Sequence, residues 1–174
     1  MSRAPEIFTP TPERSKDLRR AFGCYGTGVT VVTTELDSGP LGMTANSFSS
    51  VSLDPPLILW CPAVSSRRHD AFVTAKRFCI HVLSADQLHV AKHFAARGDG
   101  FSTSDWSPGA HGTPVLRGCL AEFHCDTHAV HPAGDHSLVL GRVVRVALHD
   151  QDAAGLLFDR GRFGHFAEQD PADQ

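Results

Sequence analysis

The cysteines of this sequence lack any pattern that indicates disulfides. Five cysteines are spread over 174 residues with no C-x-x-C pair and one left over, and the first residues lack the apolar run of a secretory signal. Long hydrophobic runs are missing as well, because proline or charge interrupts each of them well before the roughly 20 residues that span a bilayer. We therefore expect a reduced, cytoplasmic protein with no membrane span.

Positive charge is not in excess either. Sixteen Lys and Arg residues stand against nineteen Asp and Glu residues, for a formal net charge of -3. The basic residues are scattered and do not alternate with aromatics, which argues against a nucleic-acid partner. The length fits one domain with a sizeable core. We expect that domain to span residues 13–166, between a flexible N-terminal arm (1–12) and an acidic, disordered tail (167–174).

The glycines do not form the G-x-G-x-x-G fingerprint of a Rossmann dinucleotide site. The only candidates, Gly23, Gly26 and Gly28, have another spacing and follow a predicted helix instead of opening one. This absence excludes the Rossmann class of nucleotide-binding enzyme.

What the sequence does have is a dense run of short polar side chains between Gly42 and Pro56. A buried polar group costs free energy unless it is hydrogen-bonded, so this run indicates either a polar ligand along the backbone or water on an exposed edge strand. The residues alone leave both interpretations open. The polar members are Thr44, Asn46, Ser47, Ser49, Ser50 and Ser52.

Hydrophobic periodicity predicts more strands than helices. Thr11 and Pro12 begin a predicted helix whose buried stripe is Leu18 and Phe22, and Ser84 to Gln87 has the spacing of a capping box before a second helix. Short connections favour antiparallel pairing, and hence a closed antiparallel β-barrel with a few helices. The predicted strands cover residues 29–34, 42–53, 57–60, 78–83, 119–131 and 136–149.

Two loops carry possible site residues. Ser65 and Ser66 precede a short predicted helix, where a serine cap and free N–H groups favour an anion. The segment from Gly98 to Gly112 reads as a long surface loop anchored by Phe101 and Trp106, and loops of this kind often cover a site.

Histidine is abundant, with eleven residues, yet strand alternation disfavours a metal cluster. It places Cys125 on the opposite strand face from His124 and His128, and so argues against a zinc site made of these residues with His131. His81, between two apolar neighbours, fits a hydrogen-bonded structural histidine better than a catalytic one. Cysteines beside apolar segments are expected in the core; these are Cys24, Cys61 and Cys79.

Several motifs follow one another along nearly the whole chain, from about residue 18 to residue 166. They are Phe22-Gly23, the run from Gly28 to Thr34, the stretch from Gly42 to Pro56, the run from Phe78 to Leu83, Gly134-Asp135-His136 and Gly161-Arg162-Phe163. In this order they resemble the short-chain flavin reductase family, the reductase component of two-component flavin-dependent monooxygenases.

The resemblance implies an FMN-binding split barrel of Greek-key type, a homodimer, and NAD(P)H-dependent reduction of FMN or FAD for a partner monooxygenase. By position it assigns the isoalloxazine and ribityl contacts to Thr44, Ala45, Asn46 and Ser47, with Ser49 and Ser50 nearby. It assigns the phosphate to Ser65, Ser66 and Arg67. His136 would face the nicotinamide, with the loop around Phe101 close to the site. Phe163 would lie against the ring, where relatives often have tyrosine, so no hydroxyl bond is expected there.

Two functional classes remain open at this point. One is a flavin reductase that oxidises NADH or NADPH; the other is a flavin- or haem-binding split-barrel protein without turnover. His136 has a second interpretation as well, as a turn histidine that bonds the backbone and helps folding. The choice of FMN or FAD, and of NADH or NADPH, is likewise undecided by the sequence.

Overall fold

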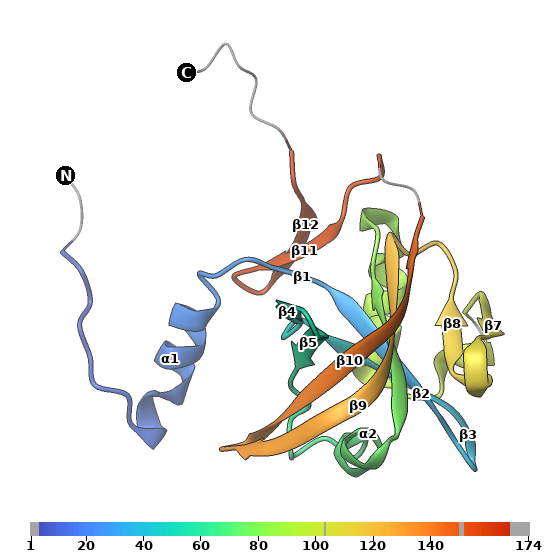
Figure 1. Ribbon diagram of the computed structural model, residues 1–174. Coiled ribbons are helices and arrows are strands. Elements are labelled where there is room, and N and C mark those ends of the chain that lie inside the picture. Colours follow the sequence, from blue (N-terminus) through green and yellow to red (C-terminus); the bar gives the residue numbers. More distant parts are fainter. Residues whose placement is uncertain (1–3, 103, 150–151, 168–174) are drawn as a thin grey trace.

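The computed structural model describes residues 4–102, 104–149 and 152–167, and its main element is an antiparallel sheet of seven strands in the order β3-β2-β6-β9-β10-β5-β4 (Figure 1). The strands are β2 (Thr30–Leu36), β3 (Gly39–Ala45), β4 (Ser49–Leu53), β5 (Pro56–Trp60), β6 (Arg77–Val82), β9 (Ala121–Ala133) and β10 (His136–Leu148). The predicted mainly β, antiparallel architecture with few helices is confirmed.

Two small sheets and three α-helices complete the described fold. The small sheets are β1 (Thr27–Gly28), β11 (Leu156–Asp159) and β12 (Arg162–His165), and the pair β7 (Trp106–Pro108) with β8 (Pro114–Leu116). The helices are α1 (Ser15–Phe22), α2 (His69–Thr74) and α3 (Leu88–Ala96), with 3-10 turns at Pro12–Arg14, Ala85–Gln87, Gly100–Ser102 and Ala110–Gly112. None of the helices among the described residues is long and apolar enough to span a membrane.

The polar stretch forms two strands at opposite edges of the sheet instead of the one strand expected. β3 pairs only with β2, and β4 only with β5, and residues 46–48 link the two edges. Four residue steps span at most about 14 Å. The two edges of the sheet are therefore close to each other where this link, which we call the seam, joins them, and the sheet must curl.

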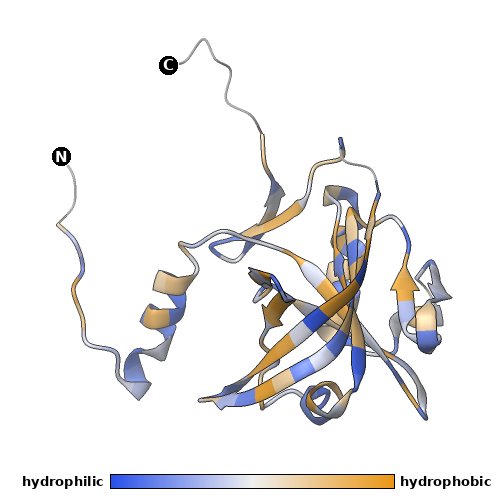
Figure 2. Cartoon of the chain, in the orientation of Figure 1, coloured by the Kyte–Doolittle hydropathy of each residue, from blue (hydrophilic) through white to orange (hydrophobic). Residues whose placement is uncertain are grey.

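The β9–β10 hairpin is the longest paired element and confirms the predicted antiparallel pair. Hydrophobic and hydrophilic residues alternate in the first part of β9 and are mixed along β10 (Figure 2). The expected half-buried character is wrong for the first part of β9, where Glu122 is 6 % exposed and His124 is 8 % exposed. The segment from Gly109 to Leu116 lies over this face, since a Cβ on Gly109 would be 3.5 Å from His124 Cε1.

The prediction of a buried stripe on the first helix is wrong. α1 has no buried residue, and Phe22 is 68 % exposed. Figure 1 shows α1 standing apart from the main sheet. Hydrophobic spacing indicates which face of a helix is apolar, but not whether the same chain supplies a surface to cover it.

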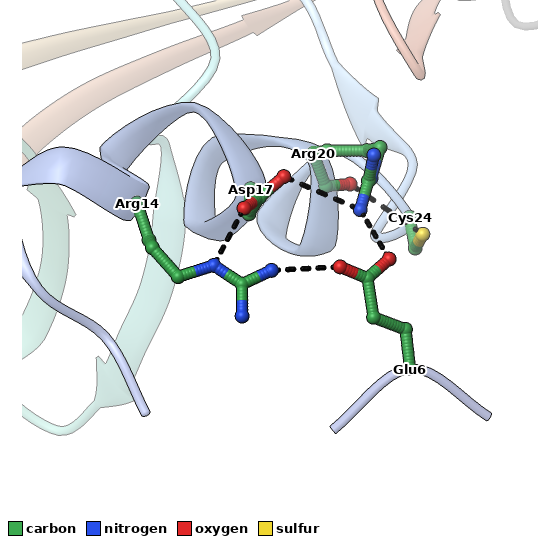
Figure 3. Close-up of polar contacts among 5 residues, drawn as sticks. All are labelled: Glu6, Arg14, Asp17, Arg20 and Cys24. Atoms are coloured by element: carbon green, nitrogen blue, oxygen red, sulfur yellow. Dashed lines mark hydrogen bonds and ion pairs between the residues drawn. The ribbon is translucent and has the colours of Figure 1, made fainter. Parts of the chain in front are cut away.

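The arm before α1 is tied to the helix by an exposed network of ion pairs. Glu6 accepts from Arg14 and from Arg20, each at 2.7 Å, and Asp17 accepts from Arg14 at 2.8 Å (Figure 3). Exposed ion pairs contribute little singly, but this network fixes the direction of residues 6–8 along the helix. The predicted acidic tail lies outside the described residues except for Ala167.

Two hydrophobic clusters fill the interior. One lies beneath α3 and contains Phe94 and Phe101, and the other is built around Trp60, Phe72 and Phe78. The expected serine–glutamine capping box before α3 is confirmed. Of the three cysteines expected in the core, Cys79 is buried and Cys61 is half-buried, but Cys24 is exposed, because it follows the uncovered helix α1.

Candidate functional site

The seam and the strand end before it are held by two of the predicted ligand residues. Thr44 Oγ1 donates to the carbonyl of Ala91 in α3 at 2.7 Å, and Ser47 Oγ accepts from the N–H of Cys61 at 2.9 Å. These hydroxyls are neither solvated nor free, so they shape the seam. Asn46, the first residue of the seam, is exposed, which leaves its amide open to a ligand.

The other predicted residues of this stretch lie on the two strands beside the seam. The Ala45 carbonyl accepts from Thr30 Oγ1 at 2.7 Å, which fixes the last residue of β3. Ser49 and Ser50 are exposed on β4, and Ser49 Oγ donates to the Ser50 carbonyl at 3.3 Å. β3 and β4 are therefore edge strands, as one interpretation of the stretch expected, but Thr44 and Ser47 bond to the protein and are not simply solvated.

The turn from Cys61 to Arg68 leads into α2 and contains the predicted anion-binding residues. Ser65 and Arg67 are exposed, and Ser66 Oγ accepts from the N–H of Arg68 at 3.3 Å. The expected serine cap of α2 is wrong, because the residue at the N-cap is Arg68 and its side chain makes no cap bond. Ser66 braces the turn one step earlier.

Arg68, which the sequence did not single out, joins three parts of the site. Its guanidinium donates to the carbonyls of Gly42 at 3.0 Å, Phe94 at 2.6 Å and Ala95 at 3.1 Å. Burial lowers the pKa of this group from its ordinary value. One side chain thus holds β3, the last turn of α3 and the 61–68 turn together.

His136 lies beside the same turn. Its backbone pairs with that of Ala63, and the N–H of Val64 donates to the Asp135 carbonyl at 2.9 Å. Its Nδ1 is 2.8 Å from an Asp135 carboxylate oxygen, and this hydrogen bond lowers the pKa of Asp135. The half-exposed ring is therefore held at one nitrogen and open to solvent beyond it.

A second histidine supports the strand start that carries His136. His69 Nε2 is 2.9 Å from Ser137 Oγ, and His69 Nδ1 is 2.8 Å from an Asp70 carboxylate oxygen. The contact to Ser137 ties the first residue of α2 to β10. It fixes the distance between the turn and His136.

The two aromatic residues assigned to the site, Phe101 and Phe163, lie in different surroundings. Phe101 is 5 % exposed and packs edge to face against Phe94 and Trp106, so it is a core residue and not a surface cover. Phe163, 36 % exposed, lies on β12 with its ring centroid 5.0 Å from that of Phe158. The small sheet that contains Phe163 includes β1, which leads into β2. The first residue of β2, Thr30, pairs with Ala45.

The remaining histidines and cysteines do not add a metal centre among the residues that the structure describes, since no group of three His, Cys, Asp or Glu side chains is placed to hold an ion. His81 is buried, with Nδ1 3.1 Å from the Val31 carbonyl and Nε2 accepting from the Leu116 N–H at 3.2 Å. The expectation of a hydrogen-bonded structural histidine is confirmed.

Comparison with known proteins shows which family this chain belongs to. Residues 22–167 match the model of the flavin reductase like domain. The chain is 50 % identical over 163 residues to the FMN reductase (NADH) SmoA of Agrobacterium fabrum, covering 94 % of this chain and 92 % of the relative. It is 40 % identical over 129 residues to the flavin-dependent monooxygenase reductase subunit HsaB of Mycobacterium tuberculosis, covering 74 % of this chain and 69 % of the relative.

The fold of this chain is similar over nearly its full length to that of a solved structure. The NADH:FAD oxidoreductase SgcE6 of Streptomyces globisporus superposes with a TM-score of 0.87 at 40 % identity, covering 96 % of each chain. The family match takes in the seam, the 61–68 turn, His136 and Phe163. The chain belongs to the flavin reductase like domain family.

Proposed function

We propose that this protein transfers hydride from NADH to FMN or FAD and supplies the reduced flavin to a partner monooxygenase. The observation that carries the proposal is the convergence of the seam, the 61–68 turn and His136, through Arg68 and the Ala63 backbone, in a chain similar to named NADH-dependent flavin reductases. FMN and FAD both appear in the names of these relatives, so both flavins are candidates.

We place the flavin along the seam, in a fold that we propose to be the FMN-binding split barrel. Thr44, Ala45, Asn46 and Ser47 would line the ring and ribityl chain, with Ser49 and Ser50 beside them. The exposed Asn46 and the open edges of β3 and β4 offer donors and acceptors to a heteroatom-rich ring. Ser65, Ser66 and Arg67 would take the phosphate, since a guanidinium and two hydroxyls suit an anion.

Hydride transfer between the two rings needs no chemical participation of the protein's side chains. Bound flavin supplies a hydride acceptor and the nicotinamide supplies the hydride. The chain's part is to hold two rings in contact, which converts a bimolecular encounter into an oriented one. Ser47 bonds the seam to Cys61, and Arg68 holds the Gly42 carbonyl of β3. His136 begins β10 beside the 61–68 turn, and we place its ring on the nicotinamide side of the flavin. We therefore assign no acid–base pair to the reaction.

A direct assay tests the proposed activity. Purified protein is mixed with NADH or NADPH and with FMN or FAD, and the absorbance of nucleotide and flavin is followed together. We expect nucleotide oxidation well above that of the flavin alone. Binding of flavin or haem without any oxidation of either nucleotide would instead establish the non-catalytic class.

His136→Ala is expected to raise KM for NADH and to slow single-turnover hydride transfer by about tenfold, with flavin affinity nearly unchanged. The reason is the proposed contact of the nicotinamide with this half-exposed ring, which Asp135 holds at Nδ1. Stopped-flow reduction of bound flavin measures the step. A lowered melting temperature with unaltered KM and rate would assign His136 to the turn.

We propose a homodimer, with the outer face of β10 in its interface. Val144, Val146 and Leu148 alternate along this strand with their side chains exposed in the single chain. Such an apolar row on a soluble surface indicates a partner, and two-fold pairing is the commonest arrangement. The five free thiols agree with a place in the cytoplasm, which we also propose.

Val146→Asp is expected to turn the dimer into a monomer, because a charge would be buried without a partner in the interface. Light scattering at micromolar concentration, with flavin present, measures the mass. Ile7→Asp, at an exposed position of the arm, is the matched control and should leave a dimer. A wild-type monomer, or a dimeric Val146→Asp variant, would contradict the proposed interface.

A further inference from the structure

A pocket of about 680 Å³ opens between the 61–68 turn and the end of α3. It adjoins β3, the strand that runs into the seam, through Leu41. Its lining is rich in arginine and includes one acidic residue. The lining residues are Leu41, Ser66, Arg67, Arg68, Ala96, Arg97, Gly98 and Asp99.

Two of the arginines face this pocket without a partner. Arg67 and Arg97 are both exposed, and neither side chain makes a hydrogen bond or ion pair within the part of the chain that the structure describes. Arg67 comes from the turn and Arg97 from the end of α3, so the two guanidinium groups approach from different elements. An anion that accepts from both would gain charge-assisted hydrogen bonds.

The backbone that carries Arg97 is fixed on both sides. The Arg97 N–H donates to the His93 carbonyl at 2.8 Å, and the Gly98 carbonyl accepts from the Gly42 N–H at 2.9 Å. A Cβ on Gly98 would lie 2.8 Å from Arg68 Cδ, so the chain packs closely there. A rigid base lowers the entropy lost when the Arg97 side chain binds a ligand.

Arg68 removes an obstacle to an anion at this position. The last carbonyls of a helix carry a partial negative charge, which repels anions. Here the guanidinium of Arg68 covers the carbonyls of Phe94 and Ala95 in the last turn of α3. The positive charge of Arg68 therefore offsets the partial negative charge of the carbonyls at this helix end.

We propose that Arg97 is a second phosphate-binding arginine, which acts with Arg67 and Ser66 on the phosphate of a nucleotide bound in this pocket. The inference rests on the proposed function, which supplies two nucleotides with the required chemistry: the flavin nucleotide and the nicotinamide dinucleotide. Asp99 lies on the same wall and weakens the hold on an anion. The repulsion by Asp99 would partly offset the attraction of the arginines and would help a bound nucleotide to dissociate.

Binding measurements with FMN and phosphate-free riboflavin test the assignment without turnover. Arg97→Ala is expected to weaken FMN binding by about tenfold to a hundredfold and to leave riboflavin binding unchanged. Arg97→Lys, which keeps the charge but not the fork of donors, should lose less. Asp99→Asn should shift the ratio of FMN to riboflavin affinity in the opposite direction, because it removes a like charge from the wall.

A steady-state measurement separates the two sources of phosphate. If Arg97→Ala leaves the FMN to riboflavin ratio unchanged but raises KM for NADH, the pocket holds the nicotinamide dinucleotide, and the assignment of Arg97 to phosphate stands. Unchanged flavin ratios and unchanged KM in Arg97→Ala would overturn it. Loss of the proposed function has a different signature, since it would appear as absent NADH oxidation in the wild-type protein.

Discussion

Arg68→Ala is expected to destabilise the folded protein by about 3 kcal/mol, in the range of hydrogen bonds made by a charged group, and so to lower Tm by roughly 6–12 °C. The guanidinium is the common donor to the carbonyls of Gly42, Phe94 and Ala95. Alanine would leave these carbonyls without that donor and would remove one of the links between β3 and the end of α3. Chemical denaturation and thermal melting measure the loss.

Arg67→Ala is the matched control for this experiment. Arg67 is the neighbouring arginine, is exposed, and makes no side-chain hydrogen bond within the described residues, so its loss should change stability by less than about 0.5 kcal/mol. It should instead weaken FMN binding by about 1.5–3 kcal/mol, as expected for a charge-assisted bond to phosphate. Equal melting temperatures for the two alanine variants would refute the structural role of Arg68.

Acidification from pH 7 to pH 5 is expected to lower the free energy of unfolding by about 2 kcal/mol through His81 alone, and by roughly 3 kcal/mol at pH 4. Burial is the main cause that lowers the pKa of His81 from 6.5 to about 4. The unfolded chain takes up this proton as the pH falls through 6.5, whereas the folded protein resists it until about 4. Stability is therefore complete above the unfolded pKa and is lost below it.

Denaturant unfolding at several pH values measures this effect, with His81→Gln as the comparison. The variant should be less stable at pH 7, because glutamine cannot keep both the bond to the Val31 carbonyl and the bond from the Leu116 N–H. Its stability should nevertheless change less between pH 7 and pH 5, since the buried titrating group is gone. An identical pH slope in wild type and variant would show that His81 is not the group responsible.

Local patterns were sufficient to predict most elements of this fold. The β-branched run before Thr34 predicted β2, and the alternation from Ala121 onward predicted β9. The capping-box spacing of Ser84 and Gln87 predicted the start of a helix. Each of these signals depends on residues within a few positions of one another, which is the range over which propensity and periodicity act.

The site depended on relationships that no local pattern contains. Arg68 gains its role from α3, whose carbonyls lie far along the chain from the 61–68 turn. Two adjacent arginines give no sign of which one is half-buried. Phe101 was expected near a ligand because it stands in a glycine-rich loop. Its ring is instead buried in the hydrophobic cluster beneath α3. The apolar spacing of α1 gave no sign that the helix is uncovered in the single chain.

The seam has a consequence for how the molecule can move. Separating any two neighbouring strands elsewhere in the main sheet breaks ladder hydrogen bonds, but β3 and β4 do not pair, so parting them breaks none. Local opening is cheapest where the fewest backbone bonds are lost. If the flavin binds along the seam as we propose, parting β3 from β4 there lets it leave for its acceptor while every described strand keeps its ladder partner.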